Sequence, residues 1–112
     1  MAFVAAVRTS EIAPGSMRKV VVGDVEILVA NVGGTFYATA ERCTHMGGHL
    51  SAGLFQDGIV TCPRHGAHFD VRTGKAVQGA KILFLQMGVK DLPIYPVRVD
   101  GEQVLVDLGS GA

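Results

Sequence analysis

The chain contains Cys43-Thr44-His45 and, after sixteen intervening residues, Cys62-Pro63-Arg64-His65. Each stretch pairs one thiolate donor with one imidazole donor, and together they hold both cysteines and two of the four histidines. Thiolates are soft, strongly donating ligands, whereas imidazoles are neutral and weaker. Two of each suit either one tetrahedral zinc ion or a two-iron, two-sulfur cluster. The residues around the two stretches help to distinguish these sites.

Glycines follow both pairs closely, Gly47 and Gly48 after the first and Gly66 after the second. Four-coordinate zinc requires neither these glycines nor so tight a C-x-H pair. With these flanks, C-x-H followed by C-x-x-H resembles the Rieske iron–sulfur family. The resemblance covers Cys43 to Leu50 as a first cluster loop and Cys62 to Lys75 as a second loop with its exit hairpin.

The resemblance implies a ligand set for a [2Fe-2S] cluster, one per chain. Cys43 and Cys62 would bind one iron, and His45 and His65 would bind the other through one ring nitrogen each. Neutral imidazoles in place of two thiolates raise the reduction potential above that of all-cysteine clusters. A structural zinc site stays open as the alternative. A disulfide between the two cysteines is less favoured, because it would leave both adjacent histidines unexplained and structural disulfides are rare in the cytosol.

The chain departs from the membrane-anchored Rieske subunits at four positions. Gly48 and Arg64 stand where those subunits carry a disulfide, and Ala67 and Phe69 replace a serine and a tyrosine whose hydroxyls bond to sulfur. Fewer donors stabilise the electron-rich reduced state less, which lowers the potential. We therefore expect a potential of about −150 to 0 mV, in the lower part of the Rieske range.

Length and composition exclude several classes of protein. A chain of 112 residues predicts one domain over residues 1–112, with no room for the further iron domain of an oxygenase large subunit. The formal net charge of zero indicates no nucleic-acid partner. Ala2 to Val7 is too short for a signal peptide, and no segment reaches the length of a membrane span. We expect a cytoplasmic location with no membrane contact.

The remaining sequence predicts an all-β fold, a small antiparallel Rieske-like domain with an inserted cluster-binding subdomain at about 42–75. Three two-residue hairpin turns are predicted at Gly23-Asp24, Gly33-Gly34 and Asp100-Gly101. Apolar and β-branched runs predict the strands, namely Phe3–Val7, Lys19–Val22, Val25–Val32, Phe36–Thr39, Gly58–Thr61, Ala67–Val71, Ile94–Val99 and Gln103–Asp107.

Three other features have less decided interpretations. His49 is expected to be a partly exposed loop residue and His68 a strand residue, in preference to extra ligands or partner contacts. Ile82 to Met87 stands where ferredoxins of the family usually have a proline-rich loop. This apolar run is expected to be a core strand or a short buried turn, with an exposed docking patch as the alternative.

Three functional hypotheses follow. The first is a soluble Rieske-type ferredoxin, an electron carrier and not itself an enzyme, which passes one electron from a flavin-dependent reductase to a terminal oxygenase. The second is a subunit or detached domain of a larger redox enzyme, similar to the small subunit of nitrite reductase. The third is a zinc-stabilised binding module. The sequence identifies neither the oxygenase and its substrate, nor the reductase, nor the oligomeric state.

Overall fold

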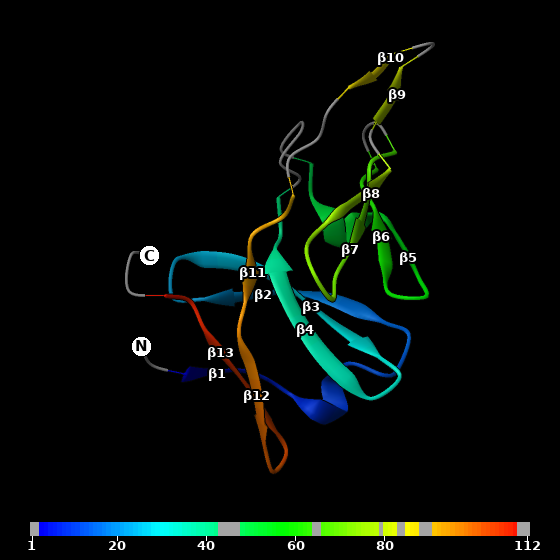
Figure 1. Ribbon diagram of the computed structural model, residues 1–112. Coiled ribbons are helices and arrows are strands. Elements are labelled where there is room, and N and C mark those ends of the chain that lie inside the picture. Colours follow the sequence, from blue (N-terminus) through cyan, green and yellow to red (C-terminus); the bar gives the residue numbers. More distant parts are fainter. Residues whose placement is uncertain are drawn as a thin grey trace.

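The protein was examined as a computed structural model that describes residues 3–42, 48–63, 66–78, 80–82, 85–87 and 91–109. The predicted all-β fold is confirmed, and every strand pairing in the described residues is antiparallel (Figure 1). Two short 3₁₀ helices join the strands, η1 (Thr9–Glu11) and η2 (Leu50–Ala52). The strands are β1 (Phe3–Arg8), β2 (Met17–Val22), β3 (Val25–Val32), β4 (Thr35–Ala40), β5 (Leu54–Gln56), β6 (Ile59–Thr61), β7 (His68–Asp70), β8 (Ala76–Gln78), β9 (Ala80–Ile82), β10 (Leu85–Met87), β11 (Ile94–Tyr95), β12 (Val97–Asp100) and β13 (Gln103–Asp107).

Strand β3 is the centre of the fold because both of its faces are buried. It lies inside the sheet β11-β4-β3-β2, and its run from Ile27 to Asn31 is buried without a break. Ile27 and Val29 pack into a core that also holds Val104 and Val106 of β13. Leu28 and Ala30, which point the other way, pack into a second core with Cys62 and Phe69. A strand buried on both faces reads as a continuous apolar run, which is how the sequence predicts it.

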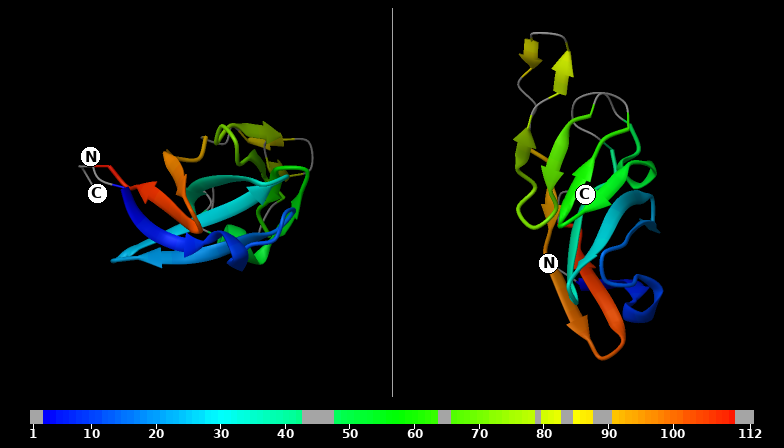
Figure 2. Two further views of the ribbon diagram at one scale, coloured as in Figure 1. Left: turned by 90° about the horizontal axis from the view of Figure 1, so that it is seen from below. Right: turned by 90° about the vertical axis from the view of Figure 1, so that its right-hand side faces the viewer.

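A separate four-stranded sheet, β5-β6-β7-β8, carries the second cysteine stretch (Figures 1 and 2). Val60 of β6 and Phe69 of β7 are fully buried and face β3 through the second core. The sequence analysis missed β5 and β8, which have only three residues each. The turn Asp57-Gly58 before β6 indicates β5, since both residues have a positive φ, as a two-residue hairpin turn of type I′ requires.

Five predicted strands differ from the observed ones by one or two residues at an end, and two other predictions, the last turn and the strand after Leu92, are wrong for identifiable reasons. The last hairpin pairs Asp100 with Gln103, so its turn is Gly101-Glu102 and not Asp100-Gly101. The predicted strand Ile94–Val99 is two strands, because Pro96 lies between β11 and β12. Proline has no N–H to donate to a sheet, and here the chain leaves its pairing with β4 and joins β13 instead. The other two predicted turns are confirmed by the pairs Val22–Val25 and Val32–Thr35.

The apolar run Ile82 to Met87 is neither a core strand of the main sheets nor a single turn. Its described residues lie in β9 and β10, which pair with each other as a two-stranded hairpin, as Figure 1 shows. Residues 83 and 84 of the run lie outside the described residues. The structure therefore corrects the predicted secondary structure, and the alternative of a docking patch stays a prediction.

The segment after this hairpin ties the sheet β5-β6-β7-β8 to the rest of the fold. The backbone N–H of Leu92 donates to the oxygen of Gly74 at 2.6 Å, and the N–H of Ala40 donates to the oxygen of Pro93 at 3.0 Å. Gly74 has a φ of +79°, and a Cβ there would overlap the backbone oxygen of Leu92 and lie 2.7 Å from Ile94 Cγ2. Only glycine fits this crossing without displacing the backbone. The end of the second loop's exit hairpin is thus fixed against β4.

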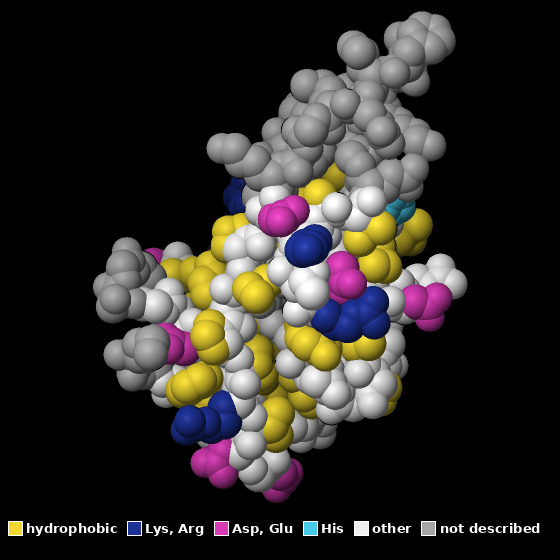
Figure 3. All heavy atoms as spheres, viewed as in Figure 1, with side chains coloured by type: hydrophobic (Ala, Val, Ile, Leu, Met, Phe, Trp, Pro, Cys, Tyr) yellow, Lys and Arg dark blue, Asp and Glu magenta, His cyan; other side chains and the backbone are white. Residues whose placement is uncertain are grey.

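Charged groups are mixed over the surface. On the face seen in Figure 3, acidic and basic side chains alternate with apolar ones, and neither sign forms a large patch among the described residues. In the part of the chain that the structure describes, no helix has the length and apolar character needed to cross a membrane.

The Arg72 side chain links the β7–β8 turn to the β5–β6 turn by an ion pair with Asp70 and a hydrogen bond to the backbone of Asp57. Arg72 Nε donates to Asp70 Oδ1 at 2.9 Å, and Arg72 Nη2 reaches the backbone oxygen of Asp57 at 3.4 Å. The hydrogen bond from the Arg72 side chain holds the pKa of Asp70 below its ordinary value of 3.8. A lowered folded-state pKa means that the pair stabilises the fold above pH 3.8 and that this contribution is lost as the pH falls below it.

Asp70→Asn is therefore expected to lower the free energy of unfolding by about 1 kcal/mol or less at neutral pH. The variant should also lose less stability than wild type as the pH falls through the acid range. Urea unfolding of wild type and variant at several pH values between about 5 and 2 measures this. Arg72→Gln should reduce the pH dependence of the unfolding free energy in the same way, because it removes the same Arg72–Asp70 ion pair. Parallel losses of stability in wild type and both variants would show that the pair contributes nothing.

Candidate metal centre

The first ligand stretch lies in a loop whose two ends are joined. Arg42 and His49 form an antiparallel bridge, and the N–H of Leu50 donates to the backbone oxygen of Glu41 at 2.9 Å. Strand β4 leads into this neck and η2 leads out of it. Cys43 and His45, the predicted ligands between the two ends, lie outside the described residues.

The second ligand stretch is the tip of the hairpin formed by β6 and β7. The N–H of Cys62 donates to the oxygen of Ala67 at 2.8 Å, and the N–H of Gly66 donates to the oxygen of Cys62 at 3.1 Å. Gly66 has a φ of +75°, which lets the chain turn back so tightly. His65, the predicted ligand in this turn, lies outside the described residues.

Cys62 is the predicted ligand that the structure describes. Its residue is 2 % exposed and it packs in the second core beside Leu50 and Ala67. The backbone of Cys62 is held by these two hydrogen bonds, and its side chain is shielded from water. Both properties suit a ligand of a metal centre that must keep its geometry while its charge changes.

The two loops meet through η2 and the residue after it. Leu50 of η2 is fully buried in the same core as Cys62. Gly53 approaches the end of β6 so closely that a Cβ on it would overlap the backbone oxygen of Thr61 and lie 3.1 Å from Pro63 Cδ. The exit of the first loop is therefore packed directly on the start of the second.

A buried carboxylate, Glu41, lies at the neck of the first loop and was not identified from the sequence. It is fully buried and accepts a hydrogen bond from Ser51 Oγ at 2.6 Å. A single glutamate next to a charged arginine has no pattern in the sequence that separates it from a solvated residue. Ser51, its hydrogen-bond partner, likewise has no sequence pattern that marks it as part of the site.

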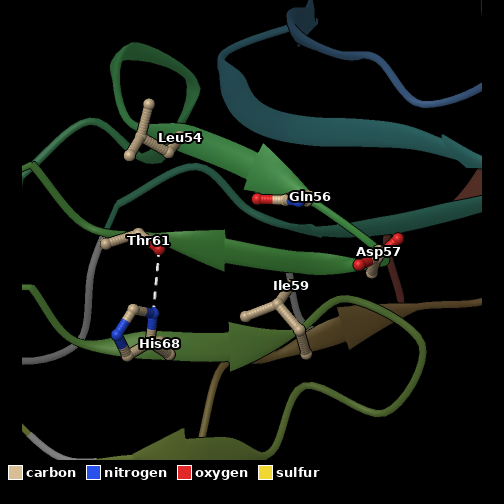
Figure 4. Close-up of a pocket in the computed structure, with 6 residues that line it drawn as sticks. All are labelled: Leu54, Gln56, Asp57, Ile59, Thr61 and His68. Carbon is tan, nitrogen blue, oxygen red and sulfur yellow. Dashed lines mark hydrogen bonds between the residues drawn. The ribbon is translucent and has the colours of Figure 1, made fainter.

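The remaining two histidines lie as expected. His49 is a loop residue whose side chain is 43 % exposed, and its Nδ1 lies 3.1 Å from Glu41 Oε2. His68 begins β7, and its Nδ1 lies 2.8 Å from Thr61 Oγ1. Figure 4 shows this pair on the outer face of the sheet, over an open hollow that is also lined by Leu54, Gln56, Asp57 and Ile59. The Thr61–His68 pair joins β6 and β7 just below the second loop.

The donor set fits a cluster that is shared by two loops. One buried cysteine is in place at the base of the second loop, and both loops are closed at their necks by hydrogen bonds. Ala67 is 1 % exposed and Phe69 fully buried, so the two positions expected to carry hydroxyls in the membrane-anchored Rieske subunits are apolar here. A mixed set of thiolates and imidazoles on two adjacent loops is the chemistry that a histidine-ligated two-iron cluster requires.

Comparison with known proteins shows the family of the chain. Residues 2–87 match the Rieske [2Fe-2S] domain. The ferredoxin component of biphenyl 2,3-dioxygenase from Rhodococcus jostii (strain RHA1) is 42 % identical over 103 residues, which are 92 % of this chain and 90 % of that protein.

Solved structures show the same fold. The ferredoxin of carbazole 1,9a-dioxygenase from Nocardioides aromaticivorans IC177 superposes with a TM-score of 0.77 at 30 % identity, covering 95 % of this chain and 97 % of that one. A chain in the complex of reduced oxygenase and oxidized ferredoxin in carbazole 1,9a-dioxygenase gives a TM-score of 0.77 at 33 % identity, covering 95 % of this chain and all of that one. The matched residues, the relatives and the shared fold together show that this chain belongs to the Rieske [2Fe-2S] family, whose cofactor is a two-iron, two-sulfur cluster.

Proposed function

We propose that the chain is a Rieske-type ferredoxin that carries one electron at a time from a flavin-dependent reductase to the terminal oxygenase of a ring-hydroxylating dioxygenase system. The observation that carries the proposal is the match to a dioxygenase ferredoxin component over 90 % of that protein's length. A relative that is itself an electron carrier favours the ferredoxin over a subunit of a larger enzyme or a zinc module. The oxygenase is the better supported partner, since a similar ferredoxin is known in complex with one.

We further propose that Cys43, His45, Cys62 and His65 are the cluster ligands and that residues 1–112 form one domain, with the ligands in a subdomain at about 42–75. Cys62 supports this ligand set by its burial and by its place at the neck of the second loop. When bound, the cluster accepts and releases one electron.

The residues around Cys62 are suited to such a carrier because they hold the loop still. The pairs Cys62–Ala67 and Thr61–His68 fix the two ends of the second loop. Leu50, which follows the first loop, packs in the same core as Cys62 and Ala67 of the second. A scaffold that does not rearrange when one charge is added keeps electron transfer fast, because little has to move in either oxidation state.

The buried side chains at 67 and 69 favour a low potential. Alanine and phenylalanine have no hydroxyl to donate toward sulfur, and both are enclosed by the second core. The reduced state therefore lacks two sources of stabilisation that the membrane-anchored Rieske subunits have. A potential of about −150 to 0 mV is suited to taking electrons from a reduced flavin.

Electron paramagnetic resonance of the dithionite-reduced protein tests the function, together with iron and sulfide analysis and a potentiometric titration. We expect an anisotropic signal with a low average g value and a midpoint below about 0 mV. The loaded protein should be reduced by a flavin reductase and reoxidised by an oxygenase of this class, and the cluster-free protein should carry no electrons between them. A colourless protein that contains zinc and gives no signal would refute the electron-carrier function.

A further inference from the structure

Glu41 is a fully buried acidic residue that directly precedes the neck of the first ligand loop. Moving a carboxylate out of water is costly unless hydrogen bonds replace its hydration. A buried carboxylate at this point of the chain therefore needs hydrogen-bond donors around it. The neighbouring residues provide these donors.

All the described partners of Glu41 follow the first loop in the sequence. Its carboxylate accepts hydrogen bonds from Ser51 Oγ at 2.6 Å and from the Ser51 N–H at 3.3 Å, and it lies 3.1 Å from His49 Nδ1. Its backbone oxygen accepts from the Leu50 N–H at 2.9 Å. One residue before the loop is thus bound to three consecutive residues after it.

These partners are also the part of the first loop that touches the second. Ser51 lies in η2 beside Leu50, which shares the second core with Cys62. Two residues after Ser51, Gly53 packs against Thr61 and Pro63. The hydrogen bonds of Glu41 therefore attach the entry of the first loop to the segment that is packed on the second.

We propose that Glu41 is a positioning residue whose carboxylate clamps the neck of the first loop and sets its distance from the second. The inference rests on the proposed ligand set, in which each iron takes one ligand from each loop. With ligands divided in this way, a shift of one loop against the other strains both irons at once. Loosening the clamp should then weaken the hold on the metal more than it weakens the fold.

The chemistry of the clamp separates two substitutions at the same position. In Glu41→Gln, the amide oxygen can accept from the Ser51 N–H while the amide nitrogen donates to Ser51 Oγ and His49 Nδ1. Glu41→Leu has a similar size and no polar atom, so the donors of Ser51 are left without this partner. Glutamine should preserve the clamp, and leucine should abolish it.

Asn31 of β3, beside the turn that joins β3 to β4, offers a matched control away from Glu41. It is 4 % exposed, donates to the oxygen of Ile12 at 2.8 Å and accepts from the N–H of Gly34 at 2.8 Å. Asn31→Ala removes these two hydrogen bonds, neither of which involves Glu41. It reports how a general loss of stability affects the metal.

The experiment measures the rate at which iron passes to a chelator and the g values of the reduced protein, for wild type and variants with cluster loaded. Glu41→Leu should release iron about tenfold faster or more and shift or broaden the g values, and Ser51→Ala should do so about threefold. Glu41→Gln should stay within about twofold of wild type. Asn31→Ala should keep the wild-type rate and signal under conditions where the fold is intact.

Release from Glu41→Leu no faster than from Asn31→Ala, with unchanged g values, would overturn the proposal. If Glu41→Leu does not fold, Ser51→Ala decides in the same way. If the wild type contains zinc and no iron, the proposed function fails, and zinc release from the same variants then judges the clamp by the same criteria.

Discussion

Cys62→Ser is expected to yield a colourless protein that binds iron more than about 100-fold more weakly than the wild type. Changes to residues that only support a metal ligand cost about 10- to 100-fold in affinity, and the loss of a ligand costs more. A serine hydroxyl stays protonated at neutral pH and is a poor donor to iron, whereas the thiolate binds it directly. Because position 62 is 2 % exposed, water has little access to replace the missing ligand. Iron and sulfide analysis and the visible absorption spectrum measure the result.

Ala67→Ser is the matched control, since it adds a hydroxyl to the other end of the same loop. The backbone oxygen of Ala67 accepts from Cys62, and its side chain is buried in the same core. This variant should keep its cluster, with a potential no lower than that of wild type, because a hydroxyl near sulfur stabilises the reduced state. A normal cluster in Cys62→Ser would remove Cys62 from the ligand set. Loss of iron from both variants would mean that packing, not ligation, explains the first result.

Gly53→Ala is expected to destabilise the fold by about 3 kcal/mol and to impair cluster assembly. Its backbone conformation is extended, so the cost comes from contact: a Cβ would overlap the oxygen of Thr61, which is itself fixed in the sheet β5-β6-β7-β8. Crowding a packed site by one carbon costs about 1–3 kcal/mol, and a clash with backbone belongs at the upper end. Denaturant unfolding gives the stability, and iron content gives the state of the two loops.

Gly101→Ala separates this contact from the general cost of replacing a glycine. Gly101 has a φ of +61°, and a Cβ there would meet no atom within 4 Å. The variant should lose about 1–2 kcal/mol from backbone strain and keep a full complement of iron, because Gly101 is in the turn between β12 and β13. Equal losses of stability and of iron in the two variants would show that Gly53 has no special place between the loops.

The sequence predicted most reliably the elements whose signal is local. The run from Val25 to Val32 and the glycine turns at 23–24 and 33–34 needed only apolar continuity and glycines with positive φ. Strands β5 and β8 were missed because they hold almost no β-branched residues, none in Leu54–Gln56 and one in Ala76–Gln78, whereas the equally short β6 consists of three. Asp57-Gly58 was nevertheless a usable turn signal for β5. The last turn was misplaced by one residue because either Asp100 or Glu102 could flank Gly101 in a tight hairpin.

The residues of the candidate site likewise differ in how far the sequence predicts them. The ligand set of Cys43, His45, Cys62 and His65 is implied by the resemblance to the Rieske family, and the motifs that carry this resemblance are short stretches that can be recognised before any fold is known. Glu41 gives no such signal. Its role depends on burial and on Ser51, ten residues away, and neither is visible without the neck that joins β4 to η2.

The burial of β3 on both faces makes the two cores cooperative. Ile27 and Val29 belong to one core while Leu28 and Ala30 belong to the other, so neither core can open without exposing the same strand. A cofactor that binds only the folded chain stabilises the whole of a cooperative unit and not just its own loops. Chains without their cluster should therefore unfold globally more often, and cellular proteases would remove them in preference to loaded chains. The central strand thus links the metal content of the protein to its lifetime.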